Sequence, residues 1–271
     1  MSNHVLWFQD PSCCEVADAG GKGASLASMT QQNLPVPRGF AVPADVLERC
    51  VDVEKLREFA RAQNHEAAVK LVEDTAVVPD EVLAAYAELD GGKVAVRSSA
   101  SAEDSEAASY AGQQETYLNV EGAEAVRKAV IDCWASFFSE RALFYRGEKG
   151  SLDDLRMAVV VQKMVDAEKA GVAFSIHPVT RRKDRMLIEA VYGLGEAVVS
   201  GEVTPDHYVV DRKGREKKSD TPHGGVLDAE ELSKLAALAV GLEQHYGKPQ
   251  DIEWAIDGSD VFLLQSRPVT A

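Results

Sequence analysis

The sequence predicts an α+β fold with two lobes, and three observations support this class. A chain of 271 residues with 45% apolar residues can bury a large core and is long enough for two lobes around a cleft. Helical and strand-like patterns both occur along it. They do not alternate strictly, as the repeated βαβ units of a doubly wound sheet would require. We expect one domain over residues 1–271, with lobes at about 1–155 and 156–271.

Helical periodicity marks two stretches of the first lobe. Residues 44–89 carry it in two pieces, and Pro79 and Asp80 are typical residues for the start of the second piece. Residues 122–145 predict a single amphipathic helix. Its expected buried stripe consists of Val126, Val130, Trp134, Phe137, Phe138 and Leu143. We interpret these helices as scaffold, with the aromatic side chains in the core.

The strand-like segments start with VAVRSS at residues 94–99, which predicts a short buried strand. The residues that follow, up to Glu115, are small and polar, as in a mobile loop, and a loop of this length is usually functional or disordered. Further strands are expected at residues 157–165, 171–176, 185–193 and 207–212, followed by a helix at 229–246 and a final hairpin.

Charge and composition narrow the function classes. The 29 Lys and Arg residues against 44 Asp and Glu give a net charge of −15, which disfavours binding to nucleic acid and to anionic membranes. The start of the chain does not look like a targeting segment and no apolar run is long enough to span a membrane, so we expect a cytoplasmic protein. The cysteines lack C-x-x-C spacing and are expected to be free thiols: Cys13, Cys14, Cys50 and Cys133.

The segment GGKGASL, residues 20–26, is the first candidate for ligand binding. Glycines let a backbone approach a ligand closely, and Lys22 would supply a positive charge for phosphate oxygens ahead of an expected helix. The spacing does not satisfy the Walker A motif. The alternative is a glycine-rich entry to a helix with a solvated lysine.

Arg97 is the second candidate, because it follows the apolar run VAV and precedes Ser98 and Ser99. Its guanidinium group would lie at the end of a strand, beside a loop of small residues. The planar fork of donors suits bidentate contact with phosphate. A surface salt bridge to one of the many carboxylates is the alternative.

The C-terminal segment DIEWAIDGSDVFLLQSRPV predicts a hairpin with a polar face. Side chains alternate along a strand, so Asp251 and Glu253 share one face, as do Gln265 and Arg267. A three-residue loop at 258–260 would pair Glu253 with Gln265, and Asp251 with Arg267. A two-residue loop would put the two pairs on opposite faces. With the longer loop, the carboxylate and amide oxygens suit Mg²⁺, and Arg267 would neutralise a transferring phosphate; the alternative is a solvated face with an Asp–Arg pair.

Gln162, Met164 and Val165 lie where the expected strand VVVQKMV leaves its sheet. Backbone groups with a flat apolar lining suit an adenine ring, although an ordinary core strand is the alternative. Glu189, in the next apolar strand, could accept hydrogen bonds from ribose hydroxyls or cap a buried arginine.

Several stretches occur in a characteristic order: VLWF, GGKGASL, LPVPRGFAV, VAVRSSASAEDSEAASYAGQQETYLNV, VVVQKMV, GVAFS, YGLGEAVVSGEVTPDHYVV, HYGKPQDIEWA and LLQSRPVT. Together they resemble the N-terminal ATP-binding domain of phosphoenolpyruvate synthase and rifampin phosphotransferase. This family also includes pyruvate phosphate dikinase and is a relative of the ATP-grasp enzymes. The resemblance covers nearly the whole chain and implies a two-lobed ATP-grasp-like fold.

The resemblance implies that the chain binds ATP and Mg²⁺, and it gives each candidate a role. Lys22 and Arg97 would bind phosphates, and Arg267 would steady the phosphate that moves, so these three are the expected catalytic residues. Gly112 and Thr116 would form a loop over the nucleotide. The other expected contacts are Gln162, Met164 and Val165 at the adenine, Glu189 at the nucleotide, and Glu253, Gln265 and Asp251 at the metal.

The loop after Arg97 looks like that of the synthase and antibiotic-kinase branch, whereas pyruvate phosphate dikinase has a different, Met-containing loop. This branch implies AMP and phosphate as products, with water accepting the γ-phosphate and a histidine accepting the β-phosphate. Relatives continue past QSRPVTA into phosphohistidine and acceptor-binding domains, which are absent here. We therefore expect a carrier and an acceptor domain on a separate polypeptide or on a missing part of the same protein.

Besides the end of the sequence after QSRPVTA, one more feature departs from the family pattern. The stretch between Tyr208 and Tyr246 looks shorter than in full-length relatives. His223 lacks the sequence context of a phosphohistidine and is expected to be an ordinary loop residue.

Two other functions stay open from the sequence. A self-contained ATP-dependent kinase or ligase acting on a small molecule would release ADP without forming a phosphoprotein. A non-catalytic regulatory subunit would bind ATP without turnover. The final acceptor of the phosphate also stays open; it could be pyruvate, an antibiotic hydroxyl, a phenol or another metabolite.

Overall fold

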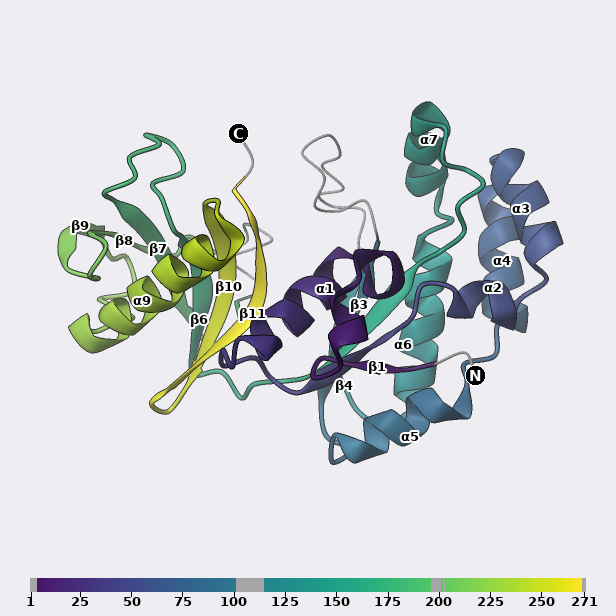
Figure 1. Cartoon of the computed structure of the whole chain (residues 1–271), viewed down its shortest axis with the longest axis horizontal. Helices are drawn as coiled ribbons and strands as arrows, with labels where there is room; N and C mark the ends of the chain where they lie inside the picture. Colours follow the sequence, from purple (N-terminus) through teal and green to yellow (C-terminus); the bar gives the residue numbers. More distant parts are fainter. Residues whose placement is uncertain (1–3, 101–114, 196–200, 202, 270–271) are drawn as a thin grey trace. The chain divides into compact units, whose positions relative to one another are not determined.

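A computed structural model of the chain describes residues 4–100, 115–195, 201 and 203–269. The chain divides into two units (Figure 1). Unit 1 comprises Met1–Asn33 and Arg38–Met164, and unit 2 comprises Leu34–Pro37 and Val165–Ala271. Each unit combines helices with an antiparallel sheet, which confirms the α+β class. The division lies later than the expected 155/156, because the strand that follows pairs with the first sheet.

Unit 1 is built on a five-stranded sheet in the order β1-β2-β5-β3-β4, and every neighbouring pair is antiparallel. Its strands are β1 (Leu6–Trp7), β2 (Gly39–Val42), β3 (Val94–Ser99), β4 (Thr116–Val120) and β5 (Ala158–Lys163). The expected strands at 94–99 and 157–165 are thus confirmed as β3 and β5. β5 lies between β2 and β3, which explains why it belongs to unit 1.

The helices of unit 1 are shorter and more numerous than the periodicity predicts. They are η1 (Pro11–Cys14), α1 (Val16–Gln31), α2 (Val46–Cys50), α3 (Val53–Arg61), α4 (His65–Thr75), α5 (Asp80–Glu88), α6 (Ala123–Ser136) and α7 (Glu140–Lys149). The single helix expected over 122–145 is wrong, because Ser139 starts a new helix by accepting a hydrogen bond from the Ala142 N–H. Asp52 and Asn64 likewise cap α3 and α4 and so divide the first expected piece.

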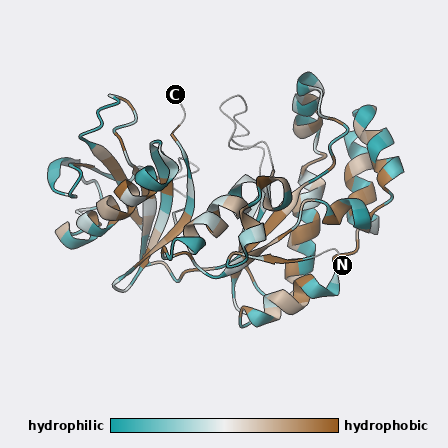
Figure 2. Ribbon diagram, in the orientation of Figure 1, coloured by the Kyte–Doolittle hydropathy of each residue, from teal (hydrophilic) through white to brown (hydrophobic). Residues whose placement is uncertain are grey.

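The two faces of the first sheet have different covers. One face packs against α6 and its neighbours in a core that contains Val96, Val130, Trp134, Phe138 and Val161. The other face carries α1, which contacts β2, β3 and β5. Apolar residues follow the strands and the inward sides of the helices in Figure 2, as expected for burial driven by the hydrophobic effect.

The cysteines are free thiols, as expected from their spacing. Cys13 is fully buried, and this burial raises its pKa to about 12. It therefore stays a neutral thiol at physiological pH.

Unit 2 contains a six-stranded antiparallel sheet in the order β11-β10-β6-β7-β8-β9. Its elements are β6 (Lys169–Phe174), β7 (Met186–Tyr192), β8 (Asp206–Val210), β9 (Glu216–Asp220), α9 (Ala229–Tyr246), β10 (Gln250–Asp257) and β11 (Asp260–Pro268). The segment Leu34–Pro37 joins this unit, and the Leu263 N–H of the edge strand β11 donates to the Pro35 carbonyl at 2.8 Å.

The helix α9 has the bounds that the sequence predicts, and its two ends explain why. Asp228 accepts hydrogen bonds from the N–H groups of Glu230 and Glu231, and the Glu231 carboxylate accepts one from the Asp228 N–H, which forms a capping box. Gly247 ends the helix in the left-handed conformation with φ of 68°. The helix contacts β6 and β10. Within the described residues, no helix is both long enough and apolar enough to cross a membrane.

Asp206 fixes the segment that leads from β9 into α9. Its buried carboxylate accepts hydrogen bonds from the backbone N–H groups of His223 at 2.7 Å, Gly225 at 3.0 Å and Val226 at 2.8 Å. The Tyr208 hydroxyl donates to it at 3.2 Å. Burial alone would raise the pKa of Asp206, but these hydrogen bonds outweigh burial and lower it.

We expect Asp206→Asn to lower the free energy of unfolding by about 1–3 kcal/mol at neutral pH, since an amide cannot accept all of these hydrogen bonds. The folded-state pKa lies below the unfolded value, so the carboxylate stabilises the fold above about pH 4. This contribution is lost as the pH falls through the folded pKa. Denaturant titrations should therefore show the difference from wild type shrinking between about pH 5 and pH 2.

Asp220→Asn, at an exposed position on β9, is the control and should change stability little at any pH. A difference for Asp206→Asn that stays constant across this pH range would contradict the role of the charged carboxylate.

Candidate functional site

The glycine-rich segment lies inside α1 rather than ahead of it. Gly20 interrupts the helix with φ of 69° and ψ of 176°, so that residues 21–31 form a second helical part. A Cβ atom at this position would lie 2.1 Å from the Ser99 carbonyl oxygen. The close approach that glycine permits here is therefore to the chain itself, at the end of β3.

Lys22 lies in the first turn after this interruption, and its side chain reaches β3. The Lys22 Nζ donates to the Ser98 carbonyl oxygen at 3.1 Å. On either side of Lys22, the Gly21 N–H donates to the Ala100 carbonyl at 3.0 Å and the Gly23 N–H to the Ser99 Oγ at 3.2 Å. The lysine-bearing turn is thus bound to the last residues of one strand.

Arg97 lies on β3 directly before Ser98, with only 6% of the residue exposed. It pairs with Thr116 of β4 and with Val160 of β5, so these residues share one face of the sheet. This is the face that α1 covers, because a Cβ added at Gly23 would lie 3.6 Å from the Val160 side chain. The structure therefore brings Lys22 and Arg97 to the same end of β3.

Gln162 extends this group along β5. It pairs with Ala95 of β3, two residues before Arg97, and therefore lies on the same face. Its side chain is almost completely buried. Met164 ends unit 1, and its N–H donates to the Lys93 carbonyl at 2.9 Å, whereas Val165 belongs to unit 2.

Thr116 is the first residue of β4 rather than part of a loop, and it is exposed. Gly112, the other residue expected over the nucleotide, lies outside the described residues. The same holds for most of the loop that follows Arg97.

In unit 2, the β10–β11 hairpin has the turn length of one expected arrangement and the strand pairing of the other. The turn has two residues, since Asp257 pairs with Asp260, but Glu253 still pairs with Gln265. The register shifts between Glu253 and Trp254, with one extra residue on β11. This β-bulge restores the pairing expected of a three-residue loop.

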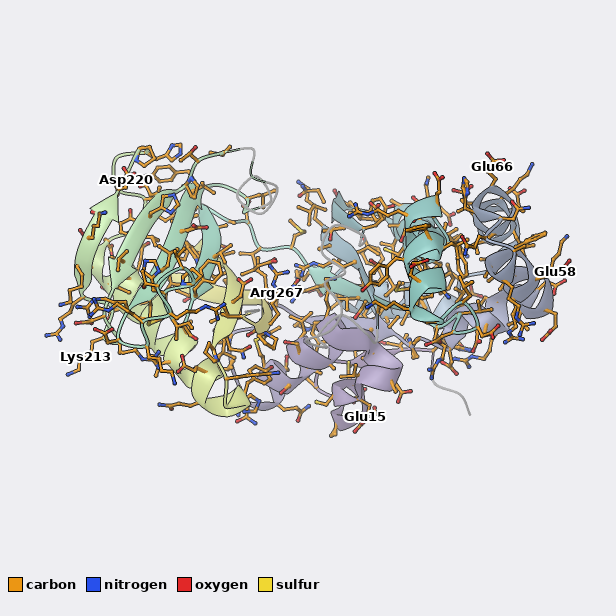
Figure 3. All side chains as sticks on the ribbon, turned by 90° about the horizontal axis from the view of Figure 1, so that it is seen from above. Glu15, Glu58, Glu66, Lys213, Asp220 and Arg267 are labelled. Atoms are coloured by element: carbon orange, nitrogen blue, oxygen red, sulfur yellow. The ribbon has the colours of Figure 1, made fainter. Side chains whose placement is uncertain are left out.

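The four polar side chains of the hairpin consequently share one face. Asp251 pairs with Arg267, and the Arg267 Nε lies 2.8 Å from the Asp251 Oδ2. The labelled Arg267 lies near the end of β11 in Figure 3. Asp251 is nearly buried, whereas Glu253 is half-buried. The Asp–Arg pair is therefore present alongside the oxygen donors Glu253 and Gln265.

Glu189 lies on the same face of this sheet, farther from the hairpin. Glu253 pairs with Val172 of β6, which in turn pairs with Glu189 of β7. The Glu189 Oε1 lies 3.2 Å from the His207 Nδ1 on β8. Burial raises the pKa of Glu189, the pair with His207 offsets part of this rise, and the Asp251 carboxylate adds to it. Glu189 thus pairs with a histidine rather than capping an arginine.

The donor set fits a magnesium ion that is held jointly with a nucleotide. Mg²⁺ is usually bound by one or two carboxylates together with substrate phosphates rather than by a complete protein cage. Glu253 and Gln265 supply one carboxylate and one amide oxygen from adjacent strands. The described part of the chain holds no group of three or more His, Cys, Asp or Glu side chains placed for a metal ion.

The sequence left several positioning residues without a role. Ser98 and Ser99 stand out only once β3 and α1 are seen together, although both belong to the motif that carries Arg97. His207 and Asp206 become visible only through the pairing of β7 with β8 and the folding of the segment after β9. Cross-strand partners of this kind are separated in sequence and carry no local pattern.

Comparison with known proteins found a matching family and several similar sequences. Residues 16–223 and 213–271 match the family described as pyruvate phosphate dikinase, AMP/ATP-binding domain. A probable phosphoenolpyruvate synthase of Methanothermobacter thermautotrophicus is 41% identical over 322 residues, covering 100% of this chain and 46% of the relative. The phosphoenolpyruvate synthase of Pyrococcus furiosus is 35% identical, covering 98% of this chain and 44% of the relative.

An uncharacterized phosphotransferase of Bacillus subtilis, YvkC, is 37% identical, covering 93% of this chain and 33% of the relative. The chain thus spans less than half the length of these relatives. A solved structure of D-alanyl-alanine synthetase A from Vibrio cholerae is similar with a TM-score of 0.43 and 10% identity, over 93% of this chain and 55% of that chain. The matches to the family cover nearly all of the sequence, and the chain belongs to the pyruvate phosphate dikinase AMP/ATP-binding domain family.

Proposed function

We propose that this chain is the Mg-ATP-binding module of a dikinase-type phosphotransferase. It would donate the β-phosphate of ATP to a histidine on a separate or missing carrier domain, with release of AMP and phosphate. The observation that carries the proposal is the convergence of Lys22 and Arg97 at the end of β3 in a chain of net charge −15. Two cationic residues at one end of the same strand would create a local site for anionic phosphate oxygens.

The chain's own residues would act by positioning and by neutralising charge. Lys22 and Arg97 would bind phosphate oxygens, and Gln162 would contact the adenine. Glu253 and Gln265 would hold Mg²⁺, which neutralises charge on the phosphates when it is bound. Arg267, oriented by Asp251, would steady the phosphate that moves. Phosphoryl transfer needs little covalent chemistry from the protein, so such a set suffices.

The length of the relatives and the family support the proposed carrier and the proposed products. The relatives are more than twice as long as the part that this chain matches, which leaves room for carrier and acceptor domains. The loop after Arg97, in its sequence, favours AMP and phosphate over AMP and pyrophosphate. The acceptor determinants would lie on those other domains.

The proposal is tested with Mg²⁺ and ATP labelled at the β-phosphate, with and without extract of the native cell. We expect turnover to form unlabelled AMP and to transfer the labelled β-phosphate to an acid-labile phosphohistidine on another protein. Lys22→Met should weaken ATP binding about 10–100-fold, because a charge-assisted contact is lost. Glu253→Ala should reduce transfer about 100-fold or more, because metal-held phosphates lose their placement.

Lys70→Met and Glu73→Ala, both at exposed positions on α4, are the matched controls and should leave binding and transfer unchanged. ADP without a phosphoprotein would instead identify a self-contained kinase or ligase. Binding without turnover, insensitive to Glu253→Ala, would identify a regulatory subunit.

A further inference from the structure

The Ser99 hydroxyl joins the two sides of the interruption in α1. It is fully buried at the end of β3. The hydroxyl donates to the Ala19 carbonyl at 2.9 Å and accepts from the Gly23 N–H at 3.2 Å. One side chain thus contacts the last residue before Gly20 and the third residue after it.

These contacts address a general problem of interrupted helices. Wherever a helical ladder stops and restarts, carbonyl groups before the break and N–H groups after it lose their partners within the helix. A buried backbone group without a partner destabilises the fold. Ser99 supplies one donor and one acceptor from a strand that lies 76 residues from Gly23 and 80 residues from Ala19 in sequence. It acts like a capping residue that comes from another element.

The same contacts set the position of Lys22 relative to Arg97. Lys22 lies between Gly21 and Gly23, whose N–H groups donate to Ala100 and to Ser99. Arg97 precedes Ser99 by two residues on the same strand and therefore shares its face. A loss of the hydroxyl would remove one of the contacts that hold the lysine-bearing turn to the strand that carries the arginine.

Ser98 has the matching role on the other side of the strand. Its Oγ accepts from the Glu115 N–H at 3.1 Å, and its N–H donates to the Glu115 carbonyl at 3.1 Å. Glu115 directly precedes Thr116, the cross-strand partner of Arg97. The two serines after Arg97 therefore hold different segments, with Ser99 holding the turn of Lys22 and Ser98 holding the start of β4.

We propose that Ser99 is a positioning residue of the nucleotide site, whose hydroxyl holds Lys22 and Arg97 at the spacing needed to bind one phosphate chain. This inference rests on the proposed function. An ordinary buried serine would contribute to stability alone, whereas a positioning residue controls ligand affinity through the lysine-bearing turn.

The test is Ser99→Ala in the full chain, followed by two measurements. Hydrogen exchange at the Gly21 and Gly23 amides reports the position of the turn without any ligand. We expect protection at Gly23 to fall about 10-fold or more, as loss of its hydrogen bond implies, and protection at Gly21, which keeps its bond to Ala100, to fall by a smaller factor. Calorimetry gives the Kd for Mg-ATP, which should rise about 10-fold for the same reason. Ser99→Cys keeps the size and a weak hydrogen-bonding group, and it should fall between alanine and wild type in both measurements.

Ser136→Ala is the matched control, because its hydroxyl donates to the Cys133 carbonyl on α6 at 2.7 Å, on the opposite side of the sheet. It should leave both measurements unchanged. Unchanged exchange at Gly21 and Gly23 in Ser99→Ala would overturn the inference, as would faster exchange with an unaltered Kd. A wild-type chain that does not bind Mg-ATP would refute the proposed function instead, and the exchange measurement would still decide whether Ser99 holds the turn.

Discussion

Replacing Gly20 with alanine is expected to destabilise unit 1 by about 3–5 kcal/mol, a value at the upper end for single substitutions. Two effects combine. The backbone at Gly20 has φ of 69° and ψ of 176°, a conformation that residues other than glycine rarely adopt. The new Cβ would also lie 2.1 Å from the Ser99 carbonyl oxygen and 2.5 Å from its carbon, so backbone atoms must move.

Gly91→Ala separates these two effects. Gly91 also has a positive φ, 59°, but a Cβ there would meet nothing within 4 Å. We expect this control to cost about 1–2 kcal/mol through the backbone conformation alone. Denaturant unfolding of both variants gives the comparison. Equal losses of stability would show that α1 can move away from β3, which contradicts the close contact described for this site.

Arg146→Met is the second substitution with a large expected effect, a loss of about 3–5 kcal/mol of unfolding free energy. Arg146 on α7 is 1% exposed, and its guanidinium donates to the carbonyl groups of Phe137, Ser151, Leu152 and Asp154. Its Cζ also lies 3.9 Å from the centre of the Phe137 ring. The side chain thereby holds the segment between α7 and β5.

Methionine retains much of the apolar bulk but leaves these buried carbonyl groups without their donor. Arg146→Lys should recover only part of the loss, because an ammonium group cannot reproduce the planar fork of donors. Arg141→Met, at an exposed position on the same helix, is the control and should change stability by less than about 0.5 kcal/mol. Equal effects at positions 141 and 146 in thermal or denaturant unfolding would contradict the assigned role.

The sequence predicts elements best where their ends carry local signals. The bounds of α9 follow from Asp228 and Gly247, and β3 is predicted from the apolar run VAV with which it begins. Periodicity does not separate the helices between residues 44 and 75, because their N-caps, Asp52 and Asn64, stand within a continuous periodic pattern. The N-caps here mark where a new helix begins.

The residues of the candidate site also differ in whether the sequence predicts them. Lys22, Arg97, Glu253 and Gln265 are visible in sequence because their residue types suit phosphate and Mg²⁺. The bulge that aligns Glu253 with Gln265 is invisible, because an extra residue on β11 leaves no compositional mark. The role of Ser99 cannot be predicted from the sequence for another reason. Its two hydrogen-bond partners lie on α1, far away in sequence. Roles that arise from long-range contacts need the structure.

The short segment Leu34–Pro37 gives β11 a protection that edge strands usually require. An exposed edge offers unpaired N–H and C=O groups to other chains and so invites aggregation. Here the Pro35 carbonyl accepts the Leu263 N–H, while Pro35 and Pro37 have no N–H of their own to continue a ladder. The segment therefore covers the edge of the sheet without offering a new row of N–H groups to which another strand could pair. A fragment beginning at Val165 would lack the segment Leu34–Pro37. The edge of β11 would then be exposed, and the fragment would need another group to cover this edge in order to stay soluble.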